Sequence, residues 1–303
     1  MRRFTLRLAL LVPALACLAA LRPSAGRGAP APHEKRAVLR FGKIPALNAR
    51  DMISGHERLM RYLSDRLGGR EVQFVLAPDY DQMARYLKDG RIDVGWLGPL
   101  NYPKAHEASG CEVIARVRRA HGDSYRGIII TRVDSGIRSL KELKGHTFAF
   151  TEPSSAAGYF YPRLTLLSAG VNPDRDIKAR CLRGHDKVVY NVFLGEVAAG
   201  AVYDDAREKL ADPAQRRRLV VLAKTKDIPN EPIVVRKGLD PALVRNLKAA
   251  LLALDGARPE DKAILDHTGN VAGFVAARDS DYDQVREDIR LYESSLGTGK
   301  AAR

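Results

Sequence analysis

Hydrophobic positions in the first half of the chain fall into short apolar runs separated by stretches with helical spacing. Residues 52–67 place apolar side chains on one helical face before Gly68 and Gly69 end the stretch, and residues 125–131 form a continuous apolar run typical of a strand covered on both faces. The pattern predicts strands at 37–44, 71–76, 92–96, 112–117 and 125–131, and helices at 52–67, 80–87 and from the turn after Pro99 to about 109. This alternation predicts an α/β fold with a mostly parallel sheet.

A second unit with the same alternation begins near Ser135. The pattern predicts strands at 148–150, 177–182, 200–203, 219–223 and 233–236, helices at 140–143, 154–168, 185–194 and 206–210, and a largely helical last third with helices at 241–254, 259–266 and 282–294. Segments 125–131 and 232–236 would cross between the two units. We therefore expect two lobes, 33–128 plus 232–303 and 129–231, with a ligand cleft between them at the carboxyl ends of strands.

The first residues differ from the rest of the chain. Arg2, Arg3 and Arg7 precede an apolar run at 8–21, and small residues follow, which is typical of a secretory signal and too short for a membrane span. We expect residues 1–32 to be a leader and tether, and the protein to be exported to the periplasm. Cys17 follows a segment that partly resembles a lipoprotein box, so a free form and a form anchored by a lipid on Cys17 both stay open.

Composition narrows the function classes. With 45% hydrophobic and 28% charged residues among 303, the chain is typical of a soluble globular protein. The formal charge of +14 favours anionic ligands or lipid headgroups, but the basic residues are dispersed without interleaved aromatics, which argues against nucleic acid. Cys111 and Cys181 fall in different predicted lobes, so we expect two free thiols. No Cys/His spacing indicates a metal site, and we expect no cofactor.

The segment 148–160, Phe-Ala-Phe-Thr-Glu-Pro-Ser-Ser-Ala-Ala-Gly-Tyr-Phe, combines a short strand, a turn and a helix start rich in small residues. Free N–H groups and the helix dipole make such a start a cradle for an anion. The structural alternative is an ordinary N-cap provided by Ser154 or Ser155. If the segment binds an anion, the donors are the N–H groups near Ser154, Ser155, Ala156 and Ala157.

Several segments, in this order, resemble one protein family. They are Tyr80 before a short helix, Ile-Asp-Val-Gly-Trp-Leu-Gly-Pro at 92–99, Tyr-Arg-Gly at 125–127, Ser-Leu-Lys-Glu-Leu-Lys-Gly at 139–145, Pro-Ser-Ser-Ala-Ala-Gly-Tyr at 153–159, Gly-His-Asp at 184–186, Tyr-Asp-Asp at 203–205 and Ile-Pro-Asn-Glu-Pro-Ile at 228–233. Over roughly residues 39–260 the chain resembles the periplasmic solute-binding proteins of phosphate, phosphite and phosphonate ABC importers. The resemblance implies a two-lobed type II periplasmic binding fold, capture of a small anion by lobe closure without chemistry, and delivery to a membrane permease. We expect a monomer.

The chain departs from the family at two places. The phosphonate-binding motif commonly carries three successive hydroxyls before Gly-Tyr, whereas here Ser155 is followed by Ala156 and Ala157. Leu97 stands where phosphonate binders often have Tyr, and Trp96 beside it is either a wall of the site or part of the core. Either other groups compensate for the missing donors, or the ligand is not a plain phosphonate.

The resemblance assigns further contacts. His185 matches the family's ligand histidine, and Tyr80 a tyrosine that reaches the cleft; a helix cap and a packed aromatic are the structural alternatives. Asp205 matches a carboxylate that holds the amine of aminoalkylphosphonates, Glu231 stands where those members have a second one, and Tyr203 lies beside them. If both acids line the cleft they would repel bare phosphate, which favours a zwitterionic ligand or a protonated oxyanion; otherwise they are solvated acids at strand ends.

Two other classes remain as alternatives. If the protein were a serine hydrolase, its catalytic triad would consist of Ser154 or Ser155, His185, and Asp204 or Asp205. The sequence has no Gly-x-Ser-x-Gly elbow, which argues against this class. A sensory binding protein that hands its ligand to a membrane receptor or kinase would use the same fold and cleft.

Overall fold

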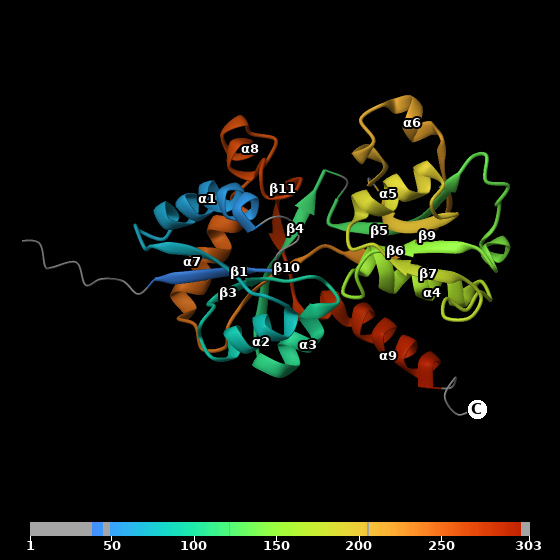
Figure 1. Ribbon diagram of the computed structural model, residues 1–303. Coiled ribbons are helices and arrows are strands. Elements are labelled where there is room, and N and C mark those ends of the chain that lie inside the picture. The colour runs from blue at the N-terminus through green and yellow to red at the C-terminus, as the bar shows by residue number, and fades with distance from the viewer. Residues whose placement is uncertain (1–37, 45–48, 121, 205, 298–303) are drawn as a thin grey trace, which may run out of the picture. The chain divides into compact units, whose positions relative to one another are not determined.

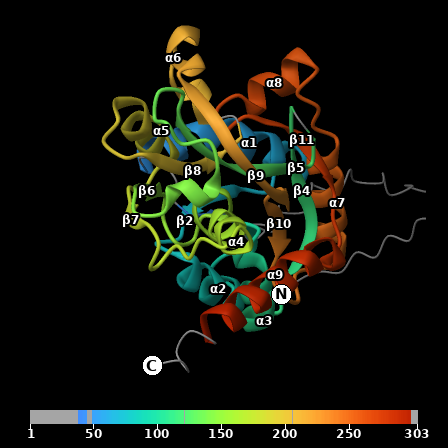
Figure 2. The same ribbon diagram turned by 90° about the vertical axis from the view of Figure 1, so that its right-hand side faces the viewer.

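The computed structural model describes residues 38–44, 49–120, 122–204 and 206–297 (Figures 1 and 2). The predicted leader at 1–32, Cys17 and Asp205 lie outside the described residues. Within the described part the secondary structure forms two sheets, of six and five strands, each with helices packed on both faces.

The first sheet has the order β11-β4-β10-β3-β1-β2. Its strands are β1 (Leu39–Lys43), β2 (Val72–Leu76), β3 (Val94–Trp96), β4 (Glu112–Arg119), β10 (Pro232–Val235) and β11 (Val271–Ala276). One face packs against α1 (Ala49–Arg66), α7 (Pro241–Leu252) and α8 (Pro259–Leu265), and the other against α2 (Tyr80–Lys88), α3 (Asn101–Ser109) and α9 (Asp283–Gly297). The amphipathic spacing of α1 accounts for this: Leu59 and Leu63 are fully buried against the sheet.

The second sheet has the order β7-β6-β8-β5-β9. Its strands are β5 (Ser124–Arg132), β6 (Thr147–Phe150), β7 (Lys178–Cys181), β8 (Ala199–Tyr203) and β9 (Leu219–Pro229). Ile128 and Ile130 of β5 pack under α5 (His185–Leu194), whereas Ile129 packs in the other core with α4 (Tyr161–Ser168). The continuous apolar run thus serves both faces of the sheet, as its sequence predicts. The short elements are η1 (Leu140–Leu143), the π-helix η2 (Ala156–Phe160), η3 (Ala206–Lys209), α6 (Pro213–Arg217) and η4 (Asp279–Tyr282).

Two crossing segments join the sheets and are tied to each other. The chain leaves the first sheet after β4, enters the second at β5, and returns from β9 to β10. The fully buried Asn230 lies in the returning segment: its backbone N–H donates to the Asp123 carbonyl at 3.1 Å, and its carbonyl accepts from the Tyr282 hydroxyl at 2.8 Å. The lobe limits at 128/129 and 231/232 stay predictions; the first falls inside β5, which pairs only within the second sheet.

Two expectations are corrected. The sheets are mixed rather than mostly parallel: among the described strand pairs, four are parallel and five antiparallel. The reason is that β5 and β10, the first strands after each crossing, run against their neighbours, and the edge strand β11 runs against β4. The last third also contains the strand β11, which pairs with β4 and which helical spacing did not predict. Cys111 is buried and Cys181 exposed, and neither forms a disulfide within the described part of the chain.

Candidate ligand-binding site

A cavity of about 510 Å³ is lined by residues from both sheets. Its walls come from the end of β4, the start of β5, the starts of η2 and α5, the end of β8 and the segment before β10. Five of the residues predicted from the sequence line it: Ser155, Ala157, His185, Tyr203 and Glu231. Strand ends and helix starts meet here because both sheets present the same edge to the cavity, which is where α/β folds bind ligands.

The helix start at η2 is both an N-cap and an open row of donors. The Ser155 hydroxyl oxygen accepts from the backbone N–H of Gly158 at 3.0 Å, so Ser155 is the N-cap that the sequence allowed. Its O–H hydrogen is not used in that bond. η2 is a π-helix, a wide turn that is frequent at functional sites, and its first N–H groups have no acceptor within the helix. The cap and the cradle therefore coexist.

Two glycines let η2 lie close to its neighbours. A Cβ added at Gly158 would lie 2.1 Å from the Thr151 hydroxyl oxygen, and one at Gly127 of β5 would lie 2.7 Å from the Ala157 carbonyl oxygen. The Thr151 N–H also donates to the Gly158 carbonyl at 3.0 Å. The turn between β6 and η2 therefore requires glycine at 158 for space, which explains why the motif ends in Gly-Tyr.

His185 is the first residue of α5 and is held as a neutral donor. Burial lowers its pKa to about 4, so the ring is uncharged at neutral pH. Its Nδ1 lies 3.3 Å from the backbone N of Tyr203, and because an N–H can only donate, Nδ1 is the acceptor and Nε2 carries the hydrogen. The ring also packs edge-on against Tyr203, with centroids 4.7 Å apart. His185 thus offers the cavity an N–H donor without a charge.

Glu231 forms an ion pair that the sequence did not reveal. Its Oε1 accepts from the Arg119 guanidinium at 2.5 Å, and both side chains line the cavity. The charge of Glu231 holds the pKa of Arg119 above its ordinary value, although burial opposes this. The other oxygen, Oε2, is buried without a hydrogen-bond partner among the described residues. Arg119 is the last residue of β4 and follows Arg118. Two basic residues at the end of a strand that faces the cleft are the sequence feature that could have predicted a cation at the site.

Lys43 is a second cation that sequence reasoning missed. It ends β1, and its Nζ lies 3.6 Å from the centroid of the Trp96 ring and 3.4 Å from Nε2 of His56. The Met52 carbonyl accepts from Nδ1 of His56 at 2.7 Å, so Nε2 is free to accept from Lys43. Burial lowers the pKa of Lys43 to about 8. The ammonium of this half-buried side chain forms no ion pair with any described carboxylate; it contacts an imidazole and an aromatic face, and the charge of Glu231 acts on it from further away.

The other predicted residues lie beside the cavity rather than on its surface. Trp96 and Leu97 are 3% and 1% exposed and belong to the two cores of the first sheet. Ala156 is buried and Ser154 half-buried, and neither lines the cavity. Tyr80 opens α2 and lines a separate cavity of about 390 Å³; burial raises its pKa to about 12, with the charges of Glu152 and Glu231 adding to the effect.

No group of described His, Cys, Asp and Glu side chains could hold a metal ion. Among the described helices, none combines the length and apolar character needed to cross a membrane.

The model of the family described as "ABC transporter, phosphonate, periplasmic substrate-binding protein" matches residues 41–282. The chain belongs to this family. The phosphonates-binding periplasmic protein of Escherichia coli is 26% identical over 87% of this chain and 79% of its own length, and the phosphate-import protein PhnD of Mycolicibacterium smegmatis is 26% identical over 90% and 92%. The protein is thus an ABC-transporter substrate-binding protein.

Solved structures of the family share the fold. The structure of PhnD1 from Prochlorococcus marinus in complex with methylphosphonate superposes with a TM-score of 0.72 at 23% identity, covering 84% of this chain and 98% of that one. A binding-protein component of an ABC phosphonate transporter from Pseudomonas aeruginosa superposes with the same TM-score of 0.72 at 24% identity, covering 88% and 89%. The predicted two-lobed periplasmic binding fold is confirmed.

Proposed function

We propose that this substrate-binding protein captures a small phosphorus oxyanion, a phosphonate, phosphite or phosphate, in the cavity described above and delivers it unchanged to the permease of an ABC importer. The observation that carries the proposal is the neutral His185, whose Nε2–H stands at the same cavity as the open N–H groups of η2. Neutral donors bind an oxyanion without a counter-charge, as helix N-termini do for phosphate.

The binding mechanism uses both sheets. The oxyanion docks on the N–H groups near Ser154, Ser155, Ala156 and Ala157, with the Ser155 hydroxyl and His185 as side-chain donors. Tyr80 joins from the first sheet when the lobes close. Closure shifts a pre-existing equilibrium toward the form that the permease recognises.

The two alanines lower the number of donors for the oxyanion. Each hydrogen bond to a charged oxygen contributes roughly 1.5–3 kcal/mol, and the common motif would have hydroxyls in place of Ala156 and Ala157. Arg119, which lines the same cavity and carries a full charge, is the described residue best placed to compensate. With two alanines in the motif, the site has fewer neutral hydrogen-bond donors and depends more on the charge of Arg119 to bind the oxyanion.

We also propose that the protein catalyses no reaction. A catalytic triad needs the histidine Nδ1–H to donate to a carboxylate, but Nδ1 of His185 accepts from a backbone N–H. The Ser155 hydroxyl oxygen accepts from Gly158, as expected of a cap rather than of a nucleophile held by a base. A fluorophosphonate probe should leave the protein unlabelled.

Export as a monomer to the periplasm, either free or anchored through Cys17, completes the proposal. Family membership favours delivery to an importer over delivery to a sensory receptor. Globomycin treatment of cells tests the anchor, because it blocks maturation of lipoproteins and would shift the mobility only of an anchored form.

Thermal unfolding with phosphate, phosphite, methylphosphonate and sulfate tests the proposal. A ligand that binds only the folded state stabilises it by about 2.7 kcal/mol at a hundredfold excess over Kd, which a melting curve detects. We expect a shift with at least one phosphorus oxyanion that is lost in His185→Ala and retained in His146→Ala, an exposed histidine that does not line the cavity. Shifts of equal size in both variants would contradict the site.

A further inference from the structure

On the first-sheet side of the cavity, the Arg119 guanidinium is paired with the Glu231 carboxylate. The family resemblance places this carboxylate where some members bind the amine of their ligand. Glu231 and Arg119 are joined at 2.5 Å, with side chains 25% and 28% exposed. A ligand ammonium would therefore have to displace a guanidinium from its partner, or approach an ion pair that has no net charge. The expectation of a zwitterionic ligand rested on Asp205 and Glu231 together, and the structure pairs Glu231, the one of the two that it describes, with Arg119.

Lys43 adds positive charge to the same row of the first sheet. The Val117 N–H of β4 donates to the Glu231 carbonyl at 3.0 Å, Ile233 of β10 pairs with Trp96 of β3, and Trp96 pairs with Lys43 of β1. Lys43 is therefore three strands away from Arg119 in this sheet and does not line the cavity, but the charges of Glu231 and Arg119 both act on its ammonium. At this wall and behind it, the described residues Arg119, Lys43 and Glu231 give two cations and one carboxylate.

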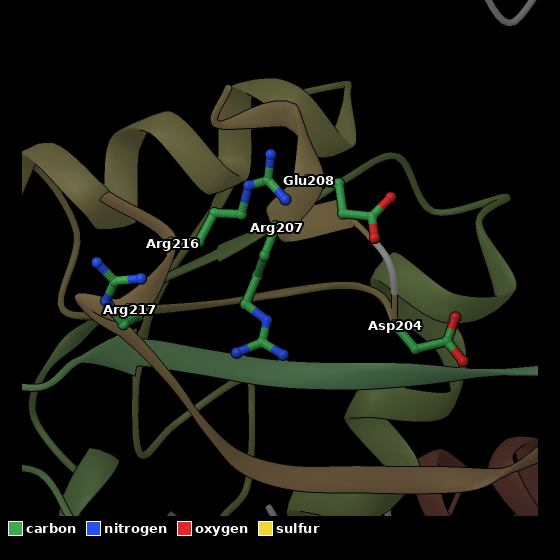
Figure 3. Close-up of a pocket in the computed structure, with 5 residues that line it drawn as sticks. All are labelled: Asp204, Arg207, Glu208, Arg216 and Arg217. Carbon is green, nitrogen blue, oxygen red and sulfur yellow. The ribbon is translucent and has the colours of Figure 1, made fainter. Parts of the chain in front are cut away.

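A smaller cavity of about 260 Å³ continues the charge pattern on the second sheet. It shares Asp204 and Glu208 with the main cavity, and it is otherwise lined by Arg207, Arg216 and Arg217 (Figure 3). The guanidiniums of Arg207 and Arg216 donate to backbone carbonyls and form no ion pair with a described residue. Together the described linings of the two cavities count five cations, including Lys209, against three carboxylates.

We propose that the ligand is a two-ended anion, an organophosphonate or phosphate ester whose second end is a carboxylate or another oxyanion, and that Arg119 receives that second end. Lys43, on β1 of the same sheet, adds positive charge behind this wall. The inference rests on the proposed function, because it assumes that the first end is the phosphorus oxyanion at η2 and His185. The cavity of about 510 Å³ leaves room for such a second end.

Three phosphonates of equal chain length test the inference. The compounds are 2-carboxyethylphosphonate, propylphosphonate and 2-aminoethylphosphonate, which differ only in a terminal carboxylate, methyl or ammonium. Isothermal titration of the full mature chain should give the lowest Kd for the carboxylate, an intermediate Kd for the methyl and the highest for the ammonium. We expect at least a tenfold ratio between the first and the last.

The variants Arg119→Met and Lys43→Met locate the selectivity. Arg119→Met leaves Glu231 without its cation, so the order should reverse, with 2-aminoethylphosphonate now preferred. Lys43→Met should weaken the carboxylate compound several-fold and leave propylphosphonate nearly unchanged. Arg118→Ala is the matched control, because the preceding residue of β4 pairs with Asp255 and does not line the cavity.

The outcomes separate the two proposals. If propylphosphonate binds but the wild type prefers the ammonium compound, the inference is wrong and the proposed function stands. If none of the three binds, the inference fails; the oxyanion proposal fails as well only if phosphate, phosphite and methylphosphonate also leave the thermal unfolding unchanged. Should Arg119→Met not fold, the double variant Arg119→Met/Glu231→Gln removes both charges and must abolish discrimination among the three tails; a preference that survives in it would overturn the role of Arg119.

Discussion

The two walls of the cavity both offer groups that can bind an anion, but the groups are of different kinds. On the second sheet, η2 and His185 present donors that carry no net charge, fixed by a cap and by a backbone hydrogen bond. On the first sheet, Arg119 lines the cavity as a full charge paired with Glu231, and Lys43 adds a second positive charge behind it. Neutral donors give geometry at low desolvation cost, whereas buried cations give strong attraction but weaken the unliganded protein. The comparison predicts that the neutral wall determines how an oxyanion is held and the charged wall determines which one.

Acid sensitivity is the largest effect expected, because each half of the molecule has one neutral histidine: the half-buried His185 at the cavity and the buried His56 beside Trp96. Burial lowers the pKa of His185 and of His56 to about 4, below the unfolded value of 6.5. Between these values the unfolded chain binds protons that the native protein does not, so stability is present above pH 6.5 and is lost as the pH falls toward 4. For His56, 3% exposed, the loss amounts to about 3 kcal/mol.

Urea unfolding between pH 4 and pH 7 measures this loss. Replacing either histidine by asparagine should remove the part of the pH dependence of stability that this histidine contributes. His146→Asn should leave the pH dependence unchanged. A profile that is already flat in the wild type would mean that both rings keep the pKa of the unfolded chain in the native state.

The tight turn of the neutral wall gives the next effect. Gly158→Ala places a methyl group 2.1 Å from the Thr151 hydroxyl oxygen, so the backbone of η2 must move. We expect a loss of stability of about 2 kcal/mol, typical of overpacking, together with loss of oxyanion binding. Differential scanning calorimetry and titration of methylphosphonate measure both. Adding Thr151→Ala, which removes the two closest clashing atoms but keeps Cβ at 2.9 Å, should restore part of the stability; no restoration would place the strain elsewhere.

Substitution of Lys43 tests how much its positive charge destabilises the unliganded protein. Burial lowers the pKa of its ammonium from 10.5 to about 8, so the charged form is disfavoured in the folded protein at pH 7. Lys43→Met should therefore raise the stability of the unliganded protein by about 1–2 kcal/mol, after subtraction of the lost contact with Trp96. Chemical unfolding without ligand measures it, and a destabilised variant would show that Lys43 is structural.

The smallest effect concerns the missing hydroxyls. Ala157 is 2% exposed as a residue and lines the cavity, so Ala157→Ser adds a donor on the neutral wall. We expect methylphosphonate to bind about tenfold more tightly, which corresponds to about 1.4 kcal/mol. Titration of Ala156→Ser, whose side chain does not line the cavity, provides the comparison, and an equal gain in both variants would argue against direct contact.

The sequence predicted the neutral wall better than the charged one, for a physical reason. The strand, the cap and the helix start at 148–160 are local features, and the predicted helix at 185–194 has the observed bounds. The pairing of Arg119 with Glu231 joins residues 112 positions apart, and no local pattern encodes it. Trp96 illustrates the same limit. An aromatic residue at a strand end has the same sequence pattern whether it lies in the core or in the cleft, and only its packing against Phe41 and Phe274 places Trp96 in the core.

The central claim is that His185 meets an oxyanion as a neutral Nε2–H donor. Nitrogen-15 NMR of the imidazole rings at pH 7, with and without methylphosphonate, tests it most directly. We predict the Nε2–H tautomer for His185 in the free protein, a downfield shift of that hydrogen on binding, and no change at His146. A His185 ring that is protonated, carries its hydrogen on Nδ1, or ignores the ligand while methylphosphonate binds would contradict the account.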